Sequence, residues 1–257
     1  MEAMKLATWN VNSLKVRLPH VLDWLAVHQP DVLCIQETKL EDHNFPLAEI
    51  QAAGYHAAFA GQKTYNGVAL ISREPVADIG TGIPNFADEQ KRVIVGRYQD
   101  VRVVCGYFPN GQSLDSDKYQ YKLAWLAALH GWLKDEIAVY PYLALLGDYN
   151  IAPAPRDVHP DIKDCDVLVS DEVRERFRLL VELGLVDSFR LFEQPEKSFS
   201  WWDYRMMAFR RNMGLRIDHI LLSEPLAAKC KSCAIDKAPR KLERPSDHAP
   251  VIADIAC

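Results

Sequence analysis

The stretch Leu143–Asn150, read L-A-L-L-G-D-Y-N, joins an apolar run to polar residues at its end. A short run rich in Leu, Ile and Val predicts a buried strand, and side chains just past its end emerge at the rim of a sheet. Two further stretches have the same form, A-T-W-N-V-N at Ala7–Asn12 and L-C-I-Q-E-T-K at Leu33–Lys39. Since α/β proteins place their ligands at such rims, the three stretches predict a site at a sheet edge.

The polar residues at these strand ends are carboxylates and carboxamides, namely Asn10, Asn12, Glu37, Asp148 and Asn150. Such hard oxygen donors suit Mg²⁺, with Mn²⁺ as a substitute, so a divalent ion is the first cofactor to expect. Any one of these residues could instead cap a strand or begin a turn. Five together, with an Asp-His pair later in the chain, favour a metal-dependent site.

That pair lies in E-R-P-S-D-H-A-P at Glu243–Pro250, where Asp247 and His248 stand side by side just before the last apolar strand. On its own the pair could be a Pro-flanked turn with a solvated acid. Together with the strand-end residues it indicates a phosphate-cleaving site. Asp218 lies inside the run R-I-D-H-I-L-L, where it could be a strand-edge acid. An acid on an apolar strand needs a partner, and His248 is the partner we expect.

The 257 residues, 49% hydrophobic and 25% charged, are ordinary for an enzyme with a large core, and we expect one domain over residues 1–257. No apolar stretch approaches the length of a bilayer span, and the N-terminal run lacks the core of a secretory signal. A cytoplasmic protein is therefore expected. Cys34 and Cys105 lie in apolar strand-like runs, so we expect no structural disulfide. The pair Cys230 and Cys233 has no second pair to complete a zinc site.

The net charge of −5 and a pI near 5.9 weigh against nucleic acid as a partner, because its binders are commonly basic. The candidate metal ligands are themselves acids, however, and only local charge near the phosphates matters once Mg²⁺ is bound. Residues that could supply this local charge are Lys39, Lys63, Arg73, Arg205, Arg210, Arg211 and Arg216.

Apolar runs and helical stripes alternate along the chain. Strands are predicted over residues 5–9, 31–36, 67–72, 92–98, 101–108, 142–146, 216–222 and 251–255. Helical stripes are formed by Val21, Leu22, Leu25 and Ala26, by Leu123, Leu126, Leu129 and Leu133, and by Phe177, Leu180 and Val181 before Gly184. Both halves of the chain have several strands with flanking helices. This suggests an α+β fold of two β-sheets packed face to face with helices outside.

A series of motifs then runs in one order nearly from end to end. They are T-W-N-V-N, Q-E-T-K, N-G-V-A-L at Asn66–Leu70, G-Y-F-P-N-G at Gly106–Gly111, G-D-Y-N-I-A-P, G-L-V-D-S-F-R ending at Arg190, S-F-S-W-W-D-Y-R, G-L-R-I-D-H at Gly214–His219, and P-S-D-H-A-P. With this set the chain resembles the endonuclease/exonuclease/phosphatase superfamily, and within it the exodeoxyribonuclease III group of bacterial DNA-repair nucleases. The resemblance implies a four-layered α/β sandwich of two packed, mainly antiparallel sheets flanked by helices, with a metal-dependent site at one edge of both sheets.

The resemblance also implies roles for single residues. By similarity Glu37 is the principal Mg²⁺ ligand, although it could be only a strand-end acid. Residues near that ion or a second ion position would be Asn10, Asp247, Asp148 and Asn150. The number of metal ions, one or two, stays open.

By similarity His248 faces the scissile phosphate, and Asp218 holds its far ring nitrogen and fixes the tautomer. Asp148 would position or deprotonate the attacking water, with Asn150 donating to it or to a phosphate oxygen. Tyr107 would stabilise charge or assist the leaving oxygen, unless it is only packed at a strand end.

The expected DNA contacts are Lys39, Asn110, Trp201 and Arg216, since a duplex is positioned mainly through its backbone. Trp201 is the candidate for a substrate pocket, whereas Trp202 could equally belong to the core. A further hypothesis concerns the loop I-A-P-A-P-R-D-V-H-P, in which His159 would restrict entry of a flipped abasic sugar.

The sequence therefore predicts an Mg²⁺-dependent hydrolase of double-stranded DNA with 3′ ends, 3′ blocks or abasic sites. It would be a monomer in base-excision repair, acting as 3′-to-5′ exonuclease and 3′-phosphatase, with abasic-site incision open and expected to be weak. Two alternatives are a phosphodiesterase for lipid or inositol phosphates and a catalytically silent DNA-binding relative.

Overall fold

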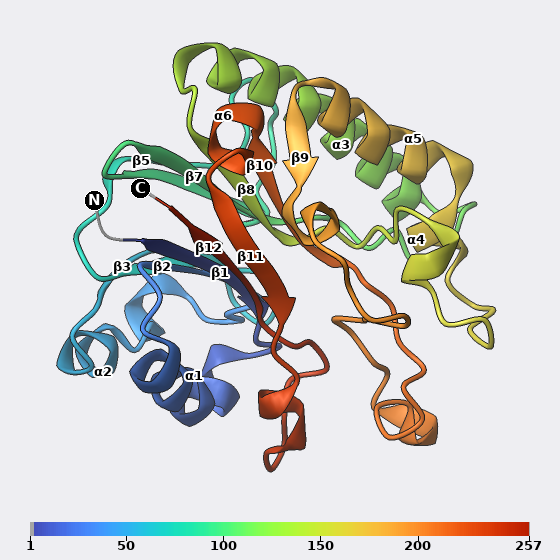
Figure 1. Cartoon of the computed structure of the whole chain (residues 1–257), viewed down its shortest axis with the longest axis horizontal. Coiled ribbons are helices and arrows are strands. Elements are labelled where there is room, and N and C mark those ends of the chain that lie inside the picture. The colour runs from blue at the N-terminus through green and yellow to red at the C-terminus, as the bar shows by residue number, and fades with distance from the viewer. Residues whose placement is uncertain (1–2, 257) are drawn as a thin grey trace.

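The computed structural model describes residues 3–256 as two six-stranded sheets packed face to face with helices on their outer sides (Figure 1). The first sheet has the order β11-β12-β1-β2-β4-β3 and the second β5-β6-β7-β8-β10-β9. The strands of the first sheet are β1 Met4–Asn10, β2 Val32–Gln36, β3 His56–Ala60, β4 Val68–Ser72, β11 Cys230–Ile235 and β12 Val251–Ile255. Those of the second are β5 Ala77–Thr81, β6 Val93–Tyr98, β7 Val101–Tyr107, β8 Leu143–Asp148, β9 Leu185–Asp187 and β10 Asp218–Ser223.

Helices cover the outer face of each sheet, with α1 and α2 on the first and α3 and α5 on the second (Figure 1). The helices are α1 Leu14–His28, α2 Leu47–Ala52, α3 Asp117–Val139, α4 Asp166–Val169, α5 Asp171–Glu182 and α6 Glu224–Ala227, whose Leu226 joins the core between the sheets. Short 3₁₀ turns span η1 Asp42–Asn44, η2 Pro155–Asp157, η3 Ser188–Leu191, η4 Arg205–Met207 and η5 Ala238–Lys241. No helix among residues 3–256 is long and apolar enough to cross a membrane.

Each sheet is mixed, with one parallel pair of strands. The parallel pairs are β1–β2 and β7–β8, and the other neighbours run antiparallel. The predicted sandwich of two mainly antiparallel sheets with flanking helices is thereby confirmed.

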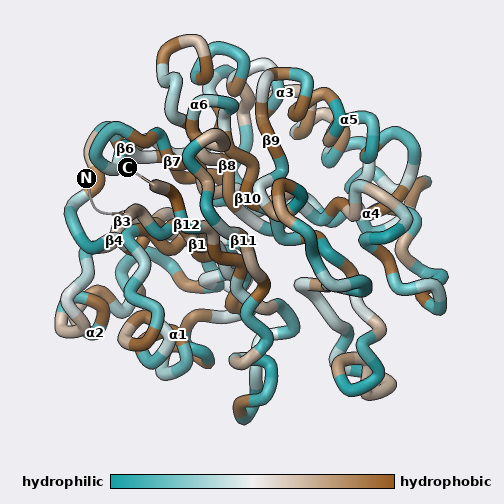
Figure 2. Tube along the Cα trace, viewed as in Figure 1, coloured by the Kyte–Doolittle hydropathy of each residue, from teal (hydrophilic) through white to brown (hydrophobic). Residues whose placement is uncertain are grey.

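The central strands are apolar throughout because both of their faces are buried. On β8, Leu143 and Leu145 pack toward α3 and α5, whereas Ala144 and Leu146 pack into the core between the sheets. The same alternation on β10 sends Ile220 inward and Leu221 outward. Buried strands of this kind read as continuous apolar runs, and the hydropathy trace is brown along central strands such as β8 and β10 (Figure 2).

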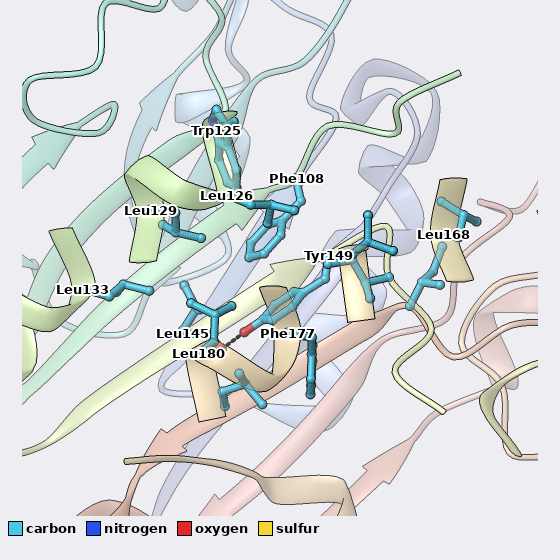
Figure 3. Packing of buried hydrophobic residues seen from close by; sticks show 14 of the residues in the cluster. Phe108, Trp125, Leu126, Leu129, Leu133, Leu145, Tyr149, Leu168, Phe177 and Leu180 are labelled. Carbon is cyan, nitrogen blue, oxygen red and sulfur yellow. Dashed lines mark hydrogen bonds between the residues drawn. The ribbon is translucent and has the colours of Figure 1, made fainter. Parts of the chain in front are cut away.

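An aromatic cluster on the outer face of the second sheet fixes the loops after β7 and β8 (Figure 3). The ring of Phe108, just past β7, stacks on Tyr149, just past β8, with centroids 4.1 Å apart. Tyr149 donates its hydroxyl to the carbonyl of Leu145 at 2.8 Å. Between the same strands a Cβ at Gly147 would lie 1.8 Å from the carbonyl oxygen of Gly106, so only glycine fits just before Asp148.

The predicted helical stripes lie on α1, α3 and α5, and the eight predicted strands correspond to β1, β2, β4, β6, β7, β8, β10 and β12. The four strands that the pattern missed, β3, β5, β9 and β11, are the edge strands of the two sheets. Edge strands are less buried, and they therefore carry weaker apolar patterns. The cysteines among residues 3–256 are free thiols.

Candidate active site

The polar site lies where the core between the two sheets ends. Register places Tyr107 of β7, Asp148 of β8 and Asp218 of β10 in one row across the second sheet, because Asp148 is the direct partner of both others. Residues in such a row point to the same face of a sheet. In this sheet that face is the inner one, because Ile220, two residues beyond Asp218, belongs to the core between the sheets.

Asn10, at the end of β1 in the first sheet, reaches across to this row. Its Nδ2 donates to Oδ2 of Asp148 and to Oε1 of Glu37, each at 2.9 Å. Its Oδ1 accepts the backbone N–H of Asn12 at 2.9 Å. One buried amide thus holds a carboxylate from each half of the sandwich.

The loop that carries Glu37 has an unusual backbone. Glu37 has φ of 55°, Lys39 of 54° and Asn12, on the neighbouring loop, of 44°. Residues with a Cβ rarely adopt this left-handed region, and where they do the backbone conformation is often tied to function. Here it lets Glu37 face Asn10 while Lys39 folds back, so that its Nζ lies 2.8 Å from Oε2 of Glu37.

His248 and Asp218 form a buried dyad. Nδ1 of His248 lies 2.9 Å and 3.0 Å from the two carboxylate oxygens of Asp218. Nε2 lies 3.7 Å from Oδ2 of Asp148. Burial alone would lower the pKa of His248, but the carboxylates of Asp218 and Asp148 raise it to about 10. The Nδ1 proton therefore points to Asp218, and Nε2 faces the open side of the site.

Asp148 is buried and surrounded by donors. Burial raises the pKa of Asp148 to about 7, although the charge of His248 opposes this shift. The backbone N–H of Asn150 donates to Oδ1 at 3.0 Å. A carboxyl group with a pKa near neutrality suits general acid/base chemistry. Ligand atoms of Asp148, Asp218 and His248 lie within 4.8 Å of one another, a buried cluster consistent with a metal site.

Asp247 is held by two donors. Nδ2 of Asn12 lies 3.0 Å from Oδ1, and the indole N–H of Trp201 lies 2.9 Å from Oδ2. Burial alone would raise the pKa of Asp247, but the charge of His248 and these hydrogen bonds keep it below its usual range. Asp247 is therefore an ionised carboxylate beside the dyad.

A cleft of about 450 Å³ opens over these groups. Its lining includes the expected site residues Glu37, Tyr107, Asn110, Asp148, Asn150, Trp201, Asp247 and His248. Burial raises the pKa of Tyr107, and the carboxylates of Glu37 and Asp148 raise it further. The phenol is consequently a neutral hydrogen-bond donor.

The two amides in the cleft are linked to each other. Nδ2 of Asn110 donates to Oδ1 of Asn150 at 3.1 Å, and Nδ2 of Asn150 donates to the carbonyl of Phe108 at 3.0 Å. Since its side chain is engaged on both sides, Asn150 orients Asp148 mainly through its backbone N–H.

Two expected residues lie away from the cleft. Arg216, expected to contact DNA, is only 1% exposed. Its guanidinium binds Asp157 at 2.7 Å and Asp187 at 2.8 Å, and it contacts Nδ1 of His219 at 3.0 Å. The expected DNA contact is wrong because the guanidinium is buried against these two acids, which lie far from Arg216 in the sequence. Burial lowers the pKa of His219 to about 4, so this ring is neutral.

His159, expected to narrow the entrance, packs edge-on against Phe199 with centroids 6.2 Å apart. Its backbone N–H donates to Gly214. Within residues 3–256 the cleft is lined by Leu168 and Cys165 rather than His159, which corrects the hypothesis about its place. Trp202 is fully buried and packs on Phe209, as the alternative reading had it.

Sequence reasoning missed one buried cation beside the site. Lys122 of α3 is 0% exposed, and its Nζ donates to three backbone carbonyls that border the cleft. Helical spacing could have revealed it, because Lys122 stands four and seven residues before the buried Leu126 and Leu129 and so lies on the same face.

Comparison with known proteins identifies the family of the chain. The model of the endonuclease/exonuclease/phosphatase family matches residues 7–248, and the chain belongs to this family. Two solved structures of NExo from Neisseria superpose with TM-scores of 0.95 and 0.93, each at 46% identity over 99% of this chain and 100% of the other. One is described as a 3′-5′ exonuclease and the other as a 3′ phosphatase bound to product DNA hairpin.

An AP endonuclease from Archaeoglobus fulgidus superposes with a TM-score of 0.95 at 39% identity, over 99% of this chain and 100% of that one. Exodeoxyribonuclease III from Haemophilus influenzae is 36% identical over 98% of this chain and 99% of its own length. Within the family the chain falls in the exonuclease III / AP endonuclease group, and it is an exodeoxyribonuclease III-type hydrolase.

Proposed function

We propose that the protein hydrolyses the bond between phosphorus and the 3′ oxygen at the 3′ ends of double-stranded DNA, releasing nucleotides or blocking phosphates with Mg²⁺ as cofactor. The main observation behind this proposal is the Asp218–His248 dyad. Asp218 holds Nδ1 of His248 at 2.9 Å, and Nε2 of His248 lies 3.7 Å from Asp148 in the cleft. The two NExo structures support it, since their described reactions break this same type of bond.

The residues fit a hard divalent cation. Carboxylate oxygens of the half-buried Glu37 and the buried Asp148 each lie 2.9 Å from one Asn10 nitrogen. Two carboxylates so close repel each other unless a cation or proton lies between them, and Lys39 pairs only with the other oxygen of Glu37. Asp218 and His248 are engaged with each other, so we assign the ion to Glu37, with Asn10, Asp247, Asp148 and Asn150 as further candidate ligands. Bound there, Mg²⁺ would neutralise phosphate oxygens and stabilise the charge that develops as the ester bond breaks.

The chain's own groups supply the proton chemistry. Asp148, oriented by Asn150, takes a proton from the water whose oxygen attacks phosphorus. The His248 imidazolium, held by Asp218, donates Nε2–H to a non-bridging phosphate oxygen. The neutral phenol of Tyr107 donates its proton to the departing 3′ oxygen, which leaves as a hydroxyl.

A projecting loop offers a surface for the duplex. It follows Trp201 and runs down from the sheets as the orange segment of Figure 1. Arg205 in this loop is exposed and pairs with Asp203 at 2.6 Å, and Met206 and Met207 beside it are 72% and 63% exposed. Cationic and apolar side chains together suit contact with phosphates and with unstacked bases. Lys39 and Asn110 at the rim of the cleft are the further contacts we propose.

Incision at abasic sites is the second candidate activity. It is favoured by the side of the cleft formed by Trp201 and Leu168, where a base-free sugar could lie, and by the likeness to an AP endonuclease.

Three end-labelled duplexes test the proposal, bearing a recessed 3′ hydroxyl, a 3′ phosphate or one internal abasic analogue. Wild type, Asp148→Asn and the exposed-site control Asp135→Asn would each be incubated with Mg²⁺ and then with EDTA. We expect wild type and Asp135→Asn to process the 3′ ends only with Mg²⁺, and Asp148→Asn to be inactive. No cleavage of any duplex by wild type would refute the assignment, and hydrolysis of lipid and inositol phosphates would then be assayed directly.

A further inference from the structure

Lys122 joins three separate segments of the chain beneath the cleft. Its Nζ donates to the carbonyl oxygens of Asn110 at 3.0 Å, Asn150 at 2.7 Å and Val167 at 2.7 Å. These residues follow β7, follow β8 and lie on α4, respectively. Three acceptors need all three ammonium protons, so this arrangement uses the full donor capacity of a lysine.

The packing around the lysine stem is equally close. Gly111 has φ of 103°, and a Cβ there would lie 3.3 Å from Cδ of Lys122 and 3.4 Å from Cβ of Val167. Ser116, which caps α3, donates its hydroxyl to the carbonyl of Gly111 at 2.7 Å. The loop after β7 is thus pinned against α3 at two adjacent points.

Stability alone does not account for a lysine at this position. Burial of an ammonium group is unfavourable, and well-packed apolar residues of similar volume often stabilise a protein as well or better. The partners of Lys122 are carbonyl oxygens rather than a carboxylate at ion-pair distance. The lysine instead holds the backbone carbonyls of Asn110, Asn150 and Val167 at fixed distances from one another.

Those backbones carry cleft residues. The N–H of Asn150 orients Asp148 at 3.0 Å, and the side chain of Asn110 donates to Asn150 at 3.1 Å. Val167 and Leu168 line the side of the cleft that also holds Trp201. A shift of any segment would therefore move the general base or change the width of the cleft.

We propose that Lys122 is a positioning residue that acts through Asn150 and α4 to align Asp148 and to set the width of the cleft. The inference rests on the proposed function for its kinetic consequence. We call the three hydrogen bonds from Nζ to Asn110, Asn150 and Val167 the Lys122 clamp, and its effect on these segments can be measured without DNA.

The test compares Lys122→Met, which keeps the length of the side chain without its donors, with Leu129→Ala. Leu129 lies about two turns beyond Lys122 on the same helix, in the core cluster of Figure 3. Its side chain forms no hydrogen bond to the loops after β7 and β8, so Leu129→Ala reports on lost packing without the loss of these hydrogen bonds. In Lys122→Met we expect kcat on a 3′-phosphate duplex to fall about tenfold to 100-fold, as for other small misplacements of catalytic groups. KM should change little. Leu129→Ala should keep kcat near wild type at a temperature where both variants are folded.

Hydrogen exchange supplies the readout that needs no substrate. The amide of Ala152 donates to Leu168 at 2.9 Å and joins the segments that follow β8 and form α4. In Lys122→Met this amide should exchange at least about tenfold faster than the loss of global stability alone would produce. In Leu129→Ala its exchange rate should rise only as much as the loss of global stability produces. Lys122→Gln retains two donors, so its kcat and its Ala152 exchange rate should lie between those of wild type and Lys122→Met. If Lys122→Met does not fold, the same two measurements on Lys122→Gln test the proposal.

Unchanged protection of Ala152 overturns the clamp, whatever the enzyme acts on. Equal losses of kcat in Lys122→Met and Leu129→Ala overturn the positioning role. If wild type fails to cleave DNA, the proposed function falls, while the exchange result still decides whether Lys122 fixes these segments.

Discussion

Replacing Asp218 with Asn removes the charge that faces His248 while keeping the shape of the side chain. In the structure both Asp218 oxygens lie within 3.0 Å of Nδ1. Asp218 and Asp148 raise the pKa of His248 from 6.5 to about 10, against the effect of burial. At ~1.4 kcal/mol per pKa unit, the site prefers imidazolium by about 5 kcal/mol.

Asp218 is the larger of the two stabilising charges, so we expect its loss to remove about half of this preference or more. The pKa of His248 should then fall by about two units. The folded-state pKa lies above the unfolded one, so this stabilisation is complete below pH 6.5 and disappears as pH rises through 10. Asp218→Asn should therefore be less stable than wild type by about 2–3 kcal/mol at pH 6, with a difference that shrinks toward pH 10.

The kinetic effect should depend on pH. With its pKa lowered to about 8, His248 in Asp218→Asn loses above that pH the positive charge that its Nε2–H presents to the phosphate, whereas wild type keeps the imidazolium up to about pH 10. At pH 9 we therefore expect kcat to be about tenfold lower in Asp218→Asn than in wild type. NMR titration of the His248 ring, denaturant unfolding at pH 6 and pH 10, and single-turnover cleavage of a 3′-phosphate duplex measure the three quantities. The exposed control Asp135→Asn should leave all three unchanged. A His248 pKa within half a unit of wild type, or a kcat at pH 9 within threefold of wild type, would refute the reasoning.

Three further predictions follow from the site and the core. Glu37→Gln should raise the Mg²⁺ concentration for half-maximal activity at least about tenfold in a metal titration, and an unchanged curve would remove Glu37 from the ligands. The folded pKa of His219, about 4, lies below its unfolded value of 6.5, so the free energy of unfolding should fall by up to about 3 kcal/mol as pH drops from 6.5 to 4. His219→Gln should lose less stability over this pH range in denaturant unfolding. An equal loss in wild type and variant would assign acid unfolding to other groups. Leu145→Ala should lower the unfolding free energy by about 2–5 kcal/mol in thermal melts and leave kcat near wild type at 20 °C, whereas a large kcat loss would show that the core sets site geometry.

The central strands and the polar residues at their ends could be predicted because strands that are buried on both faces have continuous apolar sequences. The need of a buried acid for a partner pointed from Asp218 to His248, whose Nδ1 lies 2.9 Å away. Edge strands such as β5, which is mostly exposed, carry no such pattern and escaped prediction.

Contacts between distant segments could not be derived from local patterns. The reach of Asn10 from the first sheet to Asp148 of the second depends on how the sheets pack. Arg216 was predicted to be a surface cation because its partners Asp157 and Asp187 are distant in the sequence and no local pattern indicates them. Lys122 was hidden because a single cation among leucines reads as solvent-facing until its helical position is counted.

Pairing of β1 with β12 has a consequence for the protein while it is being made. The first strand supplies Asn10, and the segment just before the last strand supplies Asp247 and His248; Ser246 donates to the carbonyl of Asn10 across 236 residues of sequence. A nascent chain translated only through β10 holds Asp148 and Asp218 but no imidazole to join them. We expect ribosome-bound intermediates to be unable to cut nucleic acid, so that hydrolytic activity begins only when the final segment emerges and docks beside β1.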